Sequence, residues 1–215
     1  VKEGINGDGK SIITVGEDLH SGYISTQVIK CSGTVHVSFE LRNSIIECDD
    51  EVVVIKNNGV IIGGKITATN KVTSPIIGND YGVTTEIEVG VVLKHKEKYI
   101  RKKTEKNEIE KQVEELKKQI SYIAQKPDNN AKTMQLMNYK EVWGRDTAMI
   151  IKIKNDLKEI EAAYYAVENP AVYVLGKVFP GTVIKIKDKQ FEVKDVMTKV
   201  KFHLVNGEIF HDNIK

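Results

Sequence analysis

Residues 27–52 read Q-V-I-K-C-S-G-T-V-H-V-S-F-E-L-R-N-S-I-I-E-C-D-D-E-V and contain one short pattern twice. In each copy an apolar residue is followed by a second one two positions later and a third six positions after the first. The first copy is Ile29, Cys31 and Val35, and the second is Ile46, Cys48 and Val52. Because side chains alternate across a strand, the first two positions predict a strand with one buried face. The third position begins another strand after a turn.

The same pattern recurs along both flanks of the chain. The further copies are Ile13/Val15/Leu19, Ile66/Ala68/Val72 and Ile87/Val89/Leu93, and then Val172/Val174/Val178 after a charged middle segment. The first positions of the five early copies are separated by 16, 17, 20 and 21 residues. Glycine or polar residues lie between the strands, at Gly16, Ser32–Gly33 and Asp49–Asp50, as is typical of corners.

Such a period indicates coils that stack on one another. One coil cannot bury its apolar face alone, but coils stacked about 4.8 Å apart give a continuous core. We therefore predict a mainly β protein with an α insertion, its β part a right-handed parallel β-helix, that is, a single-stranded solenoid. The handedness follows from strand twist and crossover preference. An antiparallel meander is the alternative.

The middle of the chain has a different pattern. Residues 94–168 carry 17 Lys/Arg and 13 Asp/Glu, about half of all charges in the chain. Apolar residues there recur in steps of three and four, at Ile109/Val113/Leu116/Ile120/Ile123 and at Ile150/Ile153/Leu157/Ile160/Tyr164/Val167. Residues 125–130 read as a turn, so we predict an antiparallel coiled-coil hairpin over 94–169. Pairing of these helices between two chains is the alternative. The solenoid then covers 1–93 and 170–215, with C-terminal strands closing it.

Residues 59–90 also resemble the signature of the FapA (flagellar assembly protein A) family. Its motif residues fall on Gly63, Gly64, Ala68, Ile77, Gly78, Thr85 and Gly90, and a closing motif falls on Val174, Gly176, Phe179, Pro180, Gly181 and Ile184. The tail F-H-L-V-N-G-E-I fits as well. The resemblance implies structural roles for these residues and a role in bacterial flagellar assembly. The separate N-terminal domain of the family is expected to be missing.

Composition disfavours most enzyme classes. The chain has 215 residues with two cysteines and five histidines, which leaves few residues for metal chemistry. Its formal net charge of +2 disfavours nucleic acid as a partner. The histidines form no H-x-H or H-x-x-x-H pair, the glycine-rich stretches lack a phosphate-loop pattern, and Asp49–Glu51 is one isolated acidic turn. We predict no catalytic, cofactor-binding or metal-binding residues and no cofactor. Cys31 and Cys48 are expected to stack as buried, reduced thiols, which suits a cytoplasmic protein.

The feature most typical of a binding surface is a basic run. Its members are Lys94, Lys96, Lys98, Arg101, Lys102, Lys103 and Lys106. We expect these residues to be a partner-binding patch or an ordinary solvated helix face. Trp143, which interrupts the second apolar series, is expected to fill the core or, if exposed, to mark a docking site.

The expected function is a non-enzymatic scaffold that works through protein–protein contacts, with a homodimer as one expected assembly. No apolar run is long enough to span a bilayer, while peripheral membrane contact stays open. Two rival classes remain. One is a polymerising cytoskeletal β-helix protein, bactofilin-like or division-inhibitor-like. The other is a carbohydrate-active β-helix enzyme, which would need carboxylates clustered on one wall.

Overall fold

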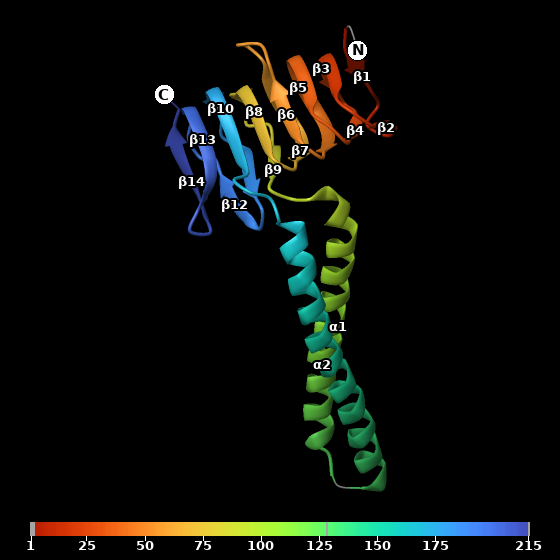
Figure 1. The fold of residues 1–215 in the computed structure, drawn as a ribbon. Helices are drawn as coiled ribbons and strands as arrows, with labels where there is room; N and C mark the ends of the chain where they lie inside the picture. The colour runs from red at the N-terminus through yellow and green to blue at the C-terminus, as the bar shows by residue number, and fades with distance from the viewer. Residues whose placement is uncertain (1–2, 128, 215) are drawn as a thin grey trace. The chain divides into compact units, whose positions relative to one another are not determined.

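A computed structural model describes residues 3–127 and 129–214. The chain divides into two compact units. The solenoid unit comprises Val1–Leu93 and Tyr165–Lys215, and the helical unit comprises Lys94–Tyr164 (Figure 1). Each unit is described by itself below.

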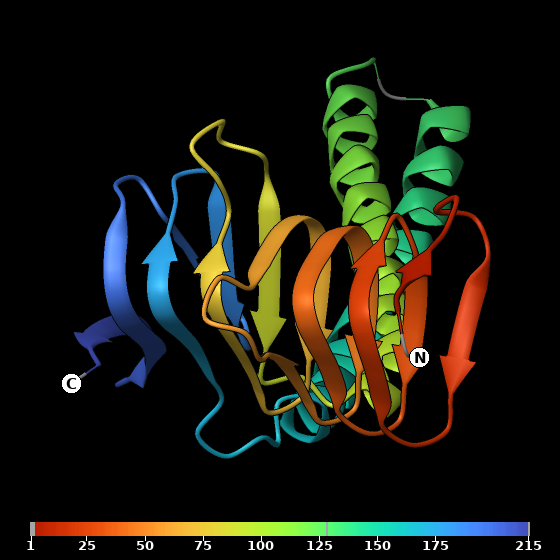
Figure 2. The ribbon, with the colours of Figure 1, turned by 90° about the horizontal axis from the view of Figure 1, so that it is seen from above.

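Short strands make up the solenoid unit. They are β1 (Ile5–Asn6), β2 (Ile12–Val15), β3 (Leu19–Ser25), β4 (Val28–Cys31), β5 (Val35–Cys48), β6 (Glu51–Val54), β7 (Val60–Ala68), β8 (Lys71–Ile77), β9 (Thr85–Val89), β10 (Ala171–Val178), β11 (Thr182–Ile186), β12 (Lys189–Glu192), β13 (Met197–Val205) and β14 (Glu208–Asn213). A 3-10 helix, Leu93–His95, follows β9. Figure 2 shows the coils following one another side by side.

Three parallel ladders run across the coils and give the solenoid three sides. The first joins β2, β4, the end of β5, the end of β7, β9 and β11. The second joins the starts of β3 and β5 to β6, β8 and β10. The third joins β1 to the end of β3, the middle of β5, the start of β7 and the end of β8. A parallel β-solenoid is therefore confirmed.

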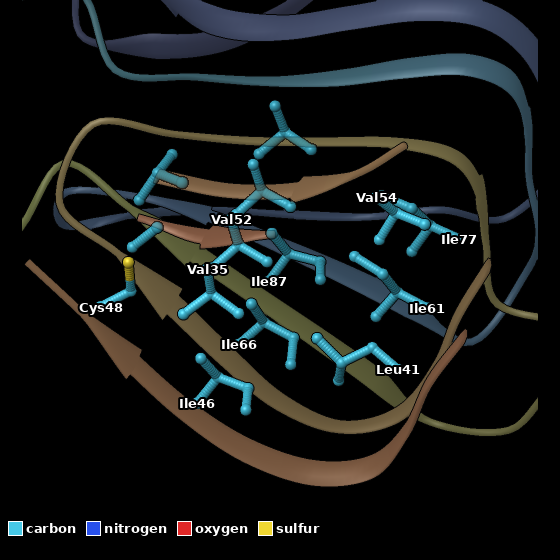
Figure 3. Close-up of a cluster of buried hydrophobic side chains, with 14 of the residues drawn as sticks. Val35, Leu41, Ile46, Cys48, Val52, Val54, Ile61, Ile66, Ile77 and Ile87 are labelled. Carbon is cyan, nitrogen blue, oxygen red and sulfur yellow. The ribbon is translucent and has the colours of Figure 1, made fainter. Parts of the chain in front are cut away.

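Equivalent apolar positions stack on one another inside the coils. Ile29, Ile46, Ile66 and Ile87 are consecutive partners on the first side, and all four are fully buried. The labelled side chains in Figure 3 point toward one another within the coil. Each buried aliphatic side chain contributes about 1.5–3 kcal/mol, so the stack is the main source of stability for this unit.

The repeat pattern is correct for the first four copies and wrong at the insertion. Leu93 lies in the 3-10 helix rather than in a strand, and the third position of that coil is filled by Val172, which pairs with Val72. The next first position is Ile184, the partner of Ile87, and not Val172. Val172 and Val174 alternate as any one-sided strand would, so their spacing could not tell one side of the solenoid from another.

The insertion replaces one corner of the solenoid. Other coils cross from the first side to the second within a few residues, such as Thr69–Asn70 between β7 and β8. In the interrupted coil the N–H of Gly90 donates to the Thr69 carbonyl (3.0 Å) and the N–H of Ala171 donates to the Asn70 carbonyl (3.4 Å). The ladder thus resumes beside the place where it stopped, and the two ends of the insertion lie close together.

Antiparallel strands follow the last coil. β13 pairs antiparallel with β10 on the second side, β14 extends β13, and β12 pairs antiparallel with β11 on the first side. These strands cover two edges that would otherwise offer unpaired backbone groups to another chain. Only β10 and β11 continue the parallel coils in this segment.

The helical unit contains α1 (Lys96–Ala124) and α2 (Asn130–Tyr164), which pack against each other. The predicted seam is confirmed within the helices, because Val113 and Ile123 on α1 and Ile153 on α2 are buried. Val167, the predicted end of the seam, lies beyond α2 and belongs to the solenoid unit. Sequence reasoning missed Tyr99, whose ring stacks on that of Tyr164 with centroids 4.6 Å apart. No helix among the described residues is long and apolar enough to cross a membrane.

Candidate interaction surfaces and a histidine cluster

The seven cations of the basic run do not share one face. Lys94 precedes α1, and the other six follow the first turns of the helix, which advances about 100° per residue. Lys102 pairs with Glu105 (3.0 Å) and Asp156 (3.6 Å). Lys106 pairs with Glu110 (3.5 Å), and Lys103 donates to the Tyr99 hydroxyl (3.1 Å).

Of these contacts, the Lys102–Asp156 pair joins α1 to α2, and the others lie within α1. Lys94, Lys98 and Arg101 are exposed. A partner-binding patch on this run would therefore contain fewer than the seven predicted cations, because Lys102, Lys103 and Lys106 already have partners within the helical unit. Its role stays a prediction.

A surface hollow of ≈ 870 Å³ lies on the helical unit beside Trp143. Val113, Ile150 and Ile151 line its apolar part, and Lys111, Glu114, Lys154 and others line its charged rim. Trp143 is half-buried, and its indole nitrogen is buried without a hydrogen-bond partner among the described residues. A tryptophan N–H usually finds a partner when it is buried. Trp143 is thus neither fully buried nor fully exposed, and it lines the hollow, so both expectations for it stay predictions.

Large apolar side chains also lie on the helical unit outside the seam. The most exposed are Tyr122, Met134, Met137 and Ile151, followed by Ile100 and Met149. Methionine adapts its shape to varied apolar partners, so such side chains are common on protein-binding surfaces.

On the solenoid, the side chains of His20 and His36 stack face to face. The two residues are register partners on β3 and β5, and their ring centroids are 4.5 Å apart with planes 7° from parallel. Asp18, at the corner before β3, completes a group whose ligand atoms all lie within 4.8 Å of one another. Within residues 3–127 and 129–214 this is the one such group of three or more His, Cys, Asp or Glu residues.

Sequence reasoning missed this cluster because it searched only for short histidine spacings. His20 and His36 are 16 residues apart, which is the length of that coil, and each directly follows a third-position apolar residue, Leu19 and Val35. Comparing the residues beside each repeat position would have placed the two rings together. The prediction that no residue binds a metal stays untested.

A shallow hollow of ≈ 510 Å³ borders the two histidines. It is lined by Glu3, Tyr23, Phe39 and Ile55 together with smaller residues of β3 and β5. The Nζ atom of Lys56 lies 6.0 Å from the centroid of the Phe39 ring. The cluster is therefore accessible from solvent and has an aromatic wall beside it.

The acidic turn Asp49–Glu51 is part of a stacked corner. Asp50 accepts hydrogen bonds from the Thr34 hydroxyl (2.8 Å) and the Asn70 amide (2.7 Å), which belong to the preceding and following coils. Glu51 pairs with Lys71 (2.9 Å). These carboxylates hold neighbouring coils in register. Among the described residues, no three carboxylates bring an oxygen each within 4.8 Å of one another, and the carbohydrate-enzyme alternative stays untested.

A charged ladder follows the outer face of the first side. Lys65 contacts Glu86 (2.5 Å) and Glu88 (2.9 Å), and Lys185 contacts Glu86 (3.1 Å). Burial alone would raise the pKa of Glu86, but the two lysines outweigh it and hold that pKa below its ordinary value. Burial would lower the pKa of Lys65, but Glu86 and Glu88 outweigh it and raise that pKa. The ladder links three successive coils electrostatically.

Replacing Glu86 with glutamine is expected to lower the free energy of unfolding near neutral pH by about 1 kcal/mol or less, as for partly exposed ion pairs. A lowered pKa stabilises the fold above the unfolded-state value near 4.5 and loses that effect as pH falls through the folded-state value. Urea unfolding should therefore show a difference between the proteins that shrinks in acid. Glu47→Gln, in the more exposed pair with Lys30 (3.6 Å), is the control. A pH-independent Glu86→Gln effect would contradict the ladder.

Cys31 and Cys48 are register partners on the first side, and both are free and buried. The Cys48 thiol donates to the carbonyls of Gly33 (2.8 Å) and Glu51 (3.1 Å). Burial raises the pKa of Cys31, and it raises the pKa of Cys48 to about 12. The predicted stacking and burial of the two cysteines are confirmed, and their reduced state in solution stays a prediction.

Because the thiolate is the reactive form, native protein at about pH 8 is expected to resist iodoacetamide at both cysteines. Denatured protein should then release two thiols, the number in the sequence. Mass spectrometry of alkylated native and denatured samples measures both quantities. Fast native labelling of Cys48, or fewer than two thiols after unfolding without reductant, would contradict the prediction.

The family-motif residues lie mainly at turns and buried ladder positions. Glycines with positive φ are Gly63, Gly64, Gly78, Gly90 and Gly181. The buried hydroxyl of Thr85 accepts from the Gly63 N–H (2.8 Å) and donates to the Val83 carbonyl (3.0 Å). Ala68 stacks between Cys48 and Val89. Pro180 and Gly181 form the turn between β10 and β11, closed by the Thr182 N–H donating to the Phe179 carbonyl (3.3 Å).

Residues 1–209 match one family model, which is described as the Flagellar Assembly Protein A beta solenoid domain. No curated protein and no solved structure matches the chain. The matched region spans nearly all of both units.

Proposed function

The chain belongs to the Flagellar Assembly Protein A (FapA) beta-solenoid family, and from this we propose that it is a non-enzymatic scaffold for bacterial flagellar assembly. The solenoid serves as a rigid body in this proposal, and the helical unit binds a protein partner. We place this activity in the cytoplasm, in keeping with two buried, reduced cysteines.

The observation that carries the proposal is the site of the insertion. The ladder hydrogen bonds of Gly90 and Ala171 continue those of the preceding coil, so we infer that the solenoid does not need the helical unit, residues 94–164, to complete its turn. Two helices of 29 and 35 residues are retained at this corner nevertheless. Their exposed apolar side chains and the hollow beside Trp143 supply a surface of the kind that protein partners bind.

A flagellated bacterium carrying this gene provides the test. Residues 94–164 are replaced with a short Gly-Ser linker, which keeps Val91 and Val167 in the solenoid, and flagella per cell are counted by electron microscopy. We expect a marked loss of flagella although the variant accumulates normally and retains its β circular dichroism. A point variant, Ile151→Glu, removes one exposed apolar contact from the hollow without touching the seam.

The control is Lys158→Glu on an exposed position of the same helix. Normal flagellation in the replacement strain would overturn the proposal that the helical unit is the binding element. Normal flagellation in a strain without the gene would overturn the flagellar role itself.

A polymerising scaffold is the second candidate, and one observation bears on it. At the first coil, β4 is the one partner of β2 among the described residues, and Ile12 is exposed there. At the last coil, β12 and β13 cover two edges with antiparallel strands. Head-to-tail stacking of parallel coils would need both ends open, so we favour a discrete scaffold. Electron microscopy of purified protein that showed filaments would favour the polymer instead.

A further inference from the structure

We propose that Asp18, His20 and His36 form a binding site for a borderline divalent transition-metal ion such as Zn²⁺. The two imidazoles come from adjacent coils and the carboxylate from the corner before β3, and their ligand atoms lie within 4.8 Å of one another. All three residues belong to the solenoid unit, and the inference is independent of the proposed scaffold role.

The donor set matches this class of ion. Two imidazole nitrogens and one carboxylate oxygen suit Zn²⁺, Cu²⁺ and Ni²⁺, whereas Ca²⁺ and Mg²⁺ prefer oxygen ligands alone. Ligands around tetrahedral zinc lie about 3.4 Å apart, which follows from metal–ligand bonds of about 2.1 Å. Ligand atoms that lie as much as 4.8 Å apart therefore have to approach one another by up to about 1.4 Å. The two imidazole rings, which lie nearly parallel, must also rotate so that one nitrogen of each points at a common ion. His20 and Asp18 are exposed and His36 is half-buried, which leaves room at the surface for these side-chain rotations.

The carboxylate is already held in place. One oxygen of Asp18 accepts a hydrogen bond from the backbone N–H of Thr34 (2.8 Å), which leaves the other oxygen for a metal. A Cβ atom at Gly33 would lie 2.3 Å from that first oxygen, so the corner has room for the carboxylate only because residue 33 is glycine. The backbones of His20 and His36 are held side by side by their register pairing in the ladder. The next residue in this ladder is Val53, which offers no ligand atom, so the group of ligands ends at His36.

The neighbouring hollow gives the ion an open side. Tyr23, Phe39 and Ile55 line it beside the imidazoles. Three protein ligands leave the remaining coordination positions for water or for a donor from a small molecule or a partner.

The test is titration of untagged, reduced, full-length protein with ZnCl₂ by isothermal titration calorimetry. We expect one saturable site per chain. His36→Ala and His20→Ala should each weaken it at least tenfold. Asp18→Asn should also weaken zinc binding, because it removes the negative charge. Its amide oxygen can still accept the hydrogen bond from the Thr34 N–H, so the corner keeps its structure. His95→Ala is the control, because His95 precedes α1 and makes no capping hydrogen bond there.

A second readout separates metal ligation from loss of structure. Bound Co²⁺ should give d–d absorption bands in the wild-type protein that weaken in the three cluster variants, while their circular dichroism stays unchanged. The proposal is overturned if wild-type protein shows no saturable zinc binding. It is also overturned if the affinity in the His20→Ala, His36→Ala double variant stays within twofold of wild type.

Discussion

Replacing Gly64 with alanine is expected to destabilise the solenoid unit by at least about 3 kcal/mol, enough to unfold it in many conditions. Gly64 has a φ of +80°, and an added Cβ would lie 2.2 Å from the carbonyl oxygen and 2.7 Å from the amide nitrogen of Ser44. Both of these are backbone atoms, and Ser44 is the ladder partner of Gly64 in the adjacent coil. The clash cannot be relieved by a side-chain rotation, so neighbouring coils must separate.

The matched control is Gly82→Ala. Gly82 also has a positive φ, +67°, but nothing lies within 4 Å of its added Cβ. Only the backbone preference opposes that alanine, at about 1–2 kcal/mol. Thermal and urea unfolding of Gly82→Ala therefore measure the loss of stability from the backbone conformation alone. The additional loss in Gly64→Ala measures the steric clash with Ser44. Equal losses of stability would contradict the close approach of the two coils at Gly64.

The residues stacked with Gly64 in successive coils explain why the sequence predicted the repeat but not the three-sided cross-section of the solenoid. Gly64 pairs with Ser44 and Thr85, which are fully buried polar residues. One position earlier, Asn43 and Gly63 both have positive φ. A corner that accepts glycine in one coil and asparagine in another leaves no consistent residue type for a pattern search to find. The apolar positions are uniform because each coil must bury them.

The histidine cluster and the charged ladder were hidden for a related reason. His20 and His36, like Glu86 and Lys65, meet only across coils, so their contact depends on the register of the solenoid. On a helix, side chains that meet are three or four residues apart in the sequence. In a solenoid, side chains that meet on adjacent coils are a whole coil apart, and the length of a coil varies. By contrast, the seam of the helical unit needed only the helical period, which the sequence repeats for several turns.

Replacing Ile153 with alanine is expected to destabilise the helical unit by about 2–4 kcal/mol, the usual effect of removing a buried branched side chain. Ile153 is 2% exposed and faces the seam, whereas Ile151, two positions earlier on α2, is 59% exposed. Ile151→Ala should change the stability of the unit by less than about 0.5 kcal/mol, because alanine favours the helix and little packing is lost. The pair of variants separates the seam from the outer surface.

Hydrogen exchange measured by mass spectrometry tests this prediction for each unit separately. Because Lys94–Tyr164 forms its own compact unit, Ile153→Ala should speed exchange at amides of α1 and α2. Amides of β5 and β7 should be unaffected, since the coil ladder resumes across Gly90 and Ala171 without the helices. Faster exchange in the strands as well would mean that the two units unfold together. In that case the helical insertion would be part of the stability of the solenoid and not an independent binding element.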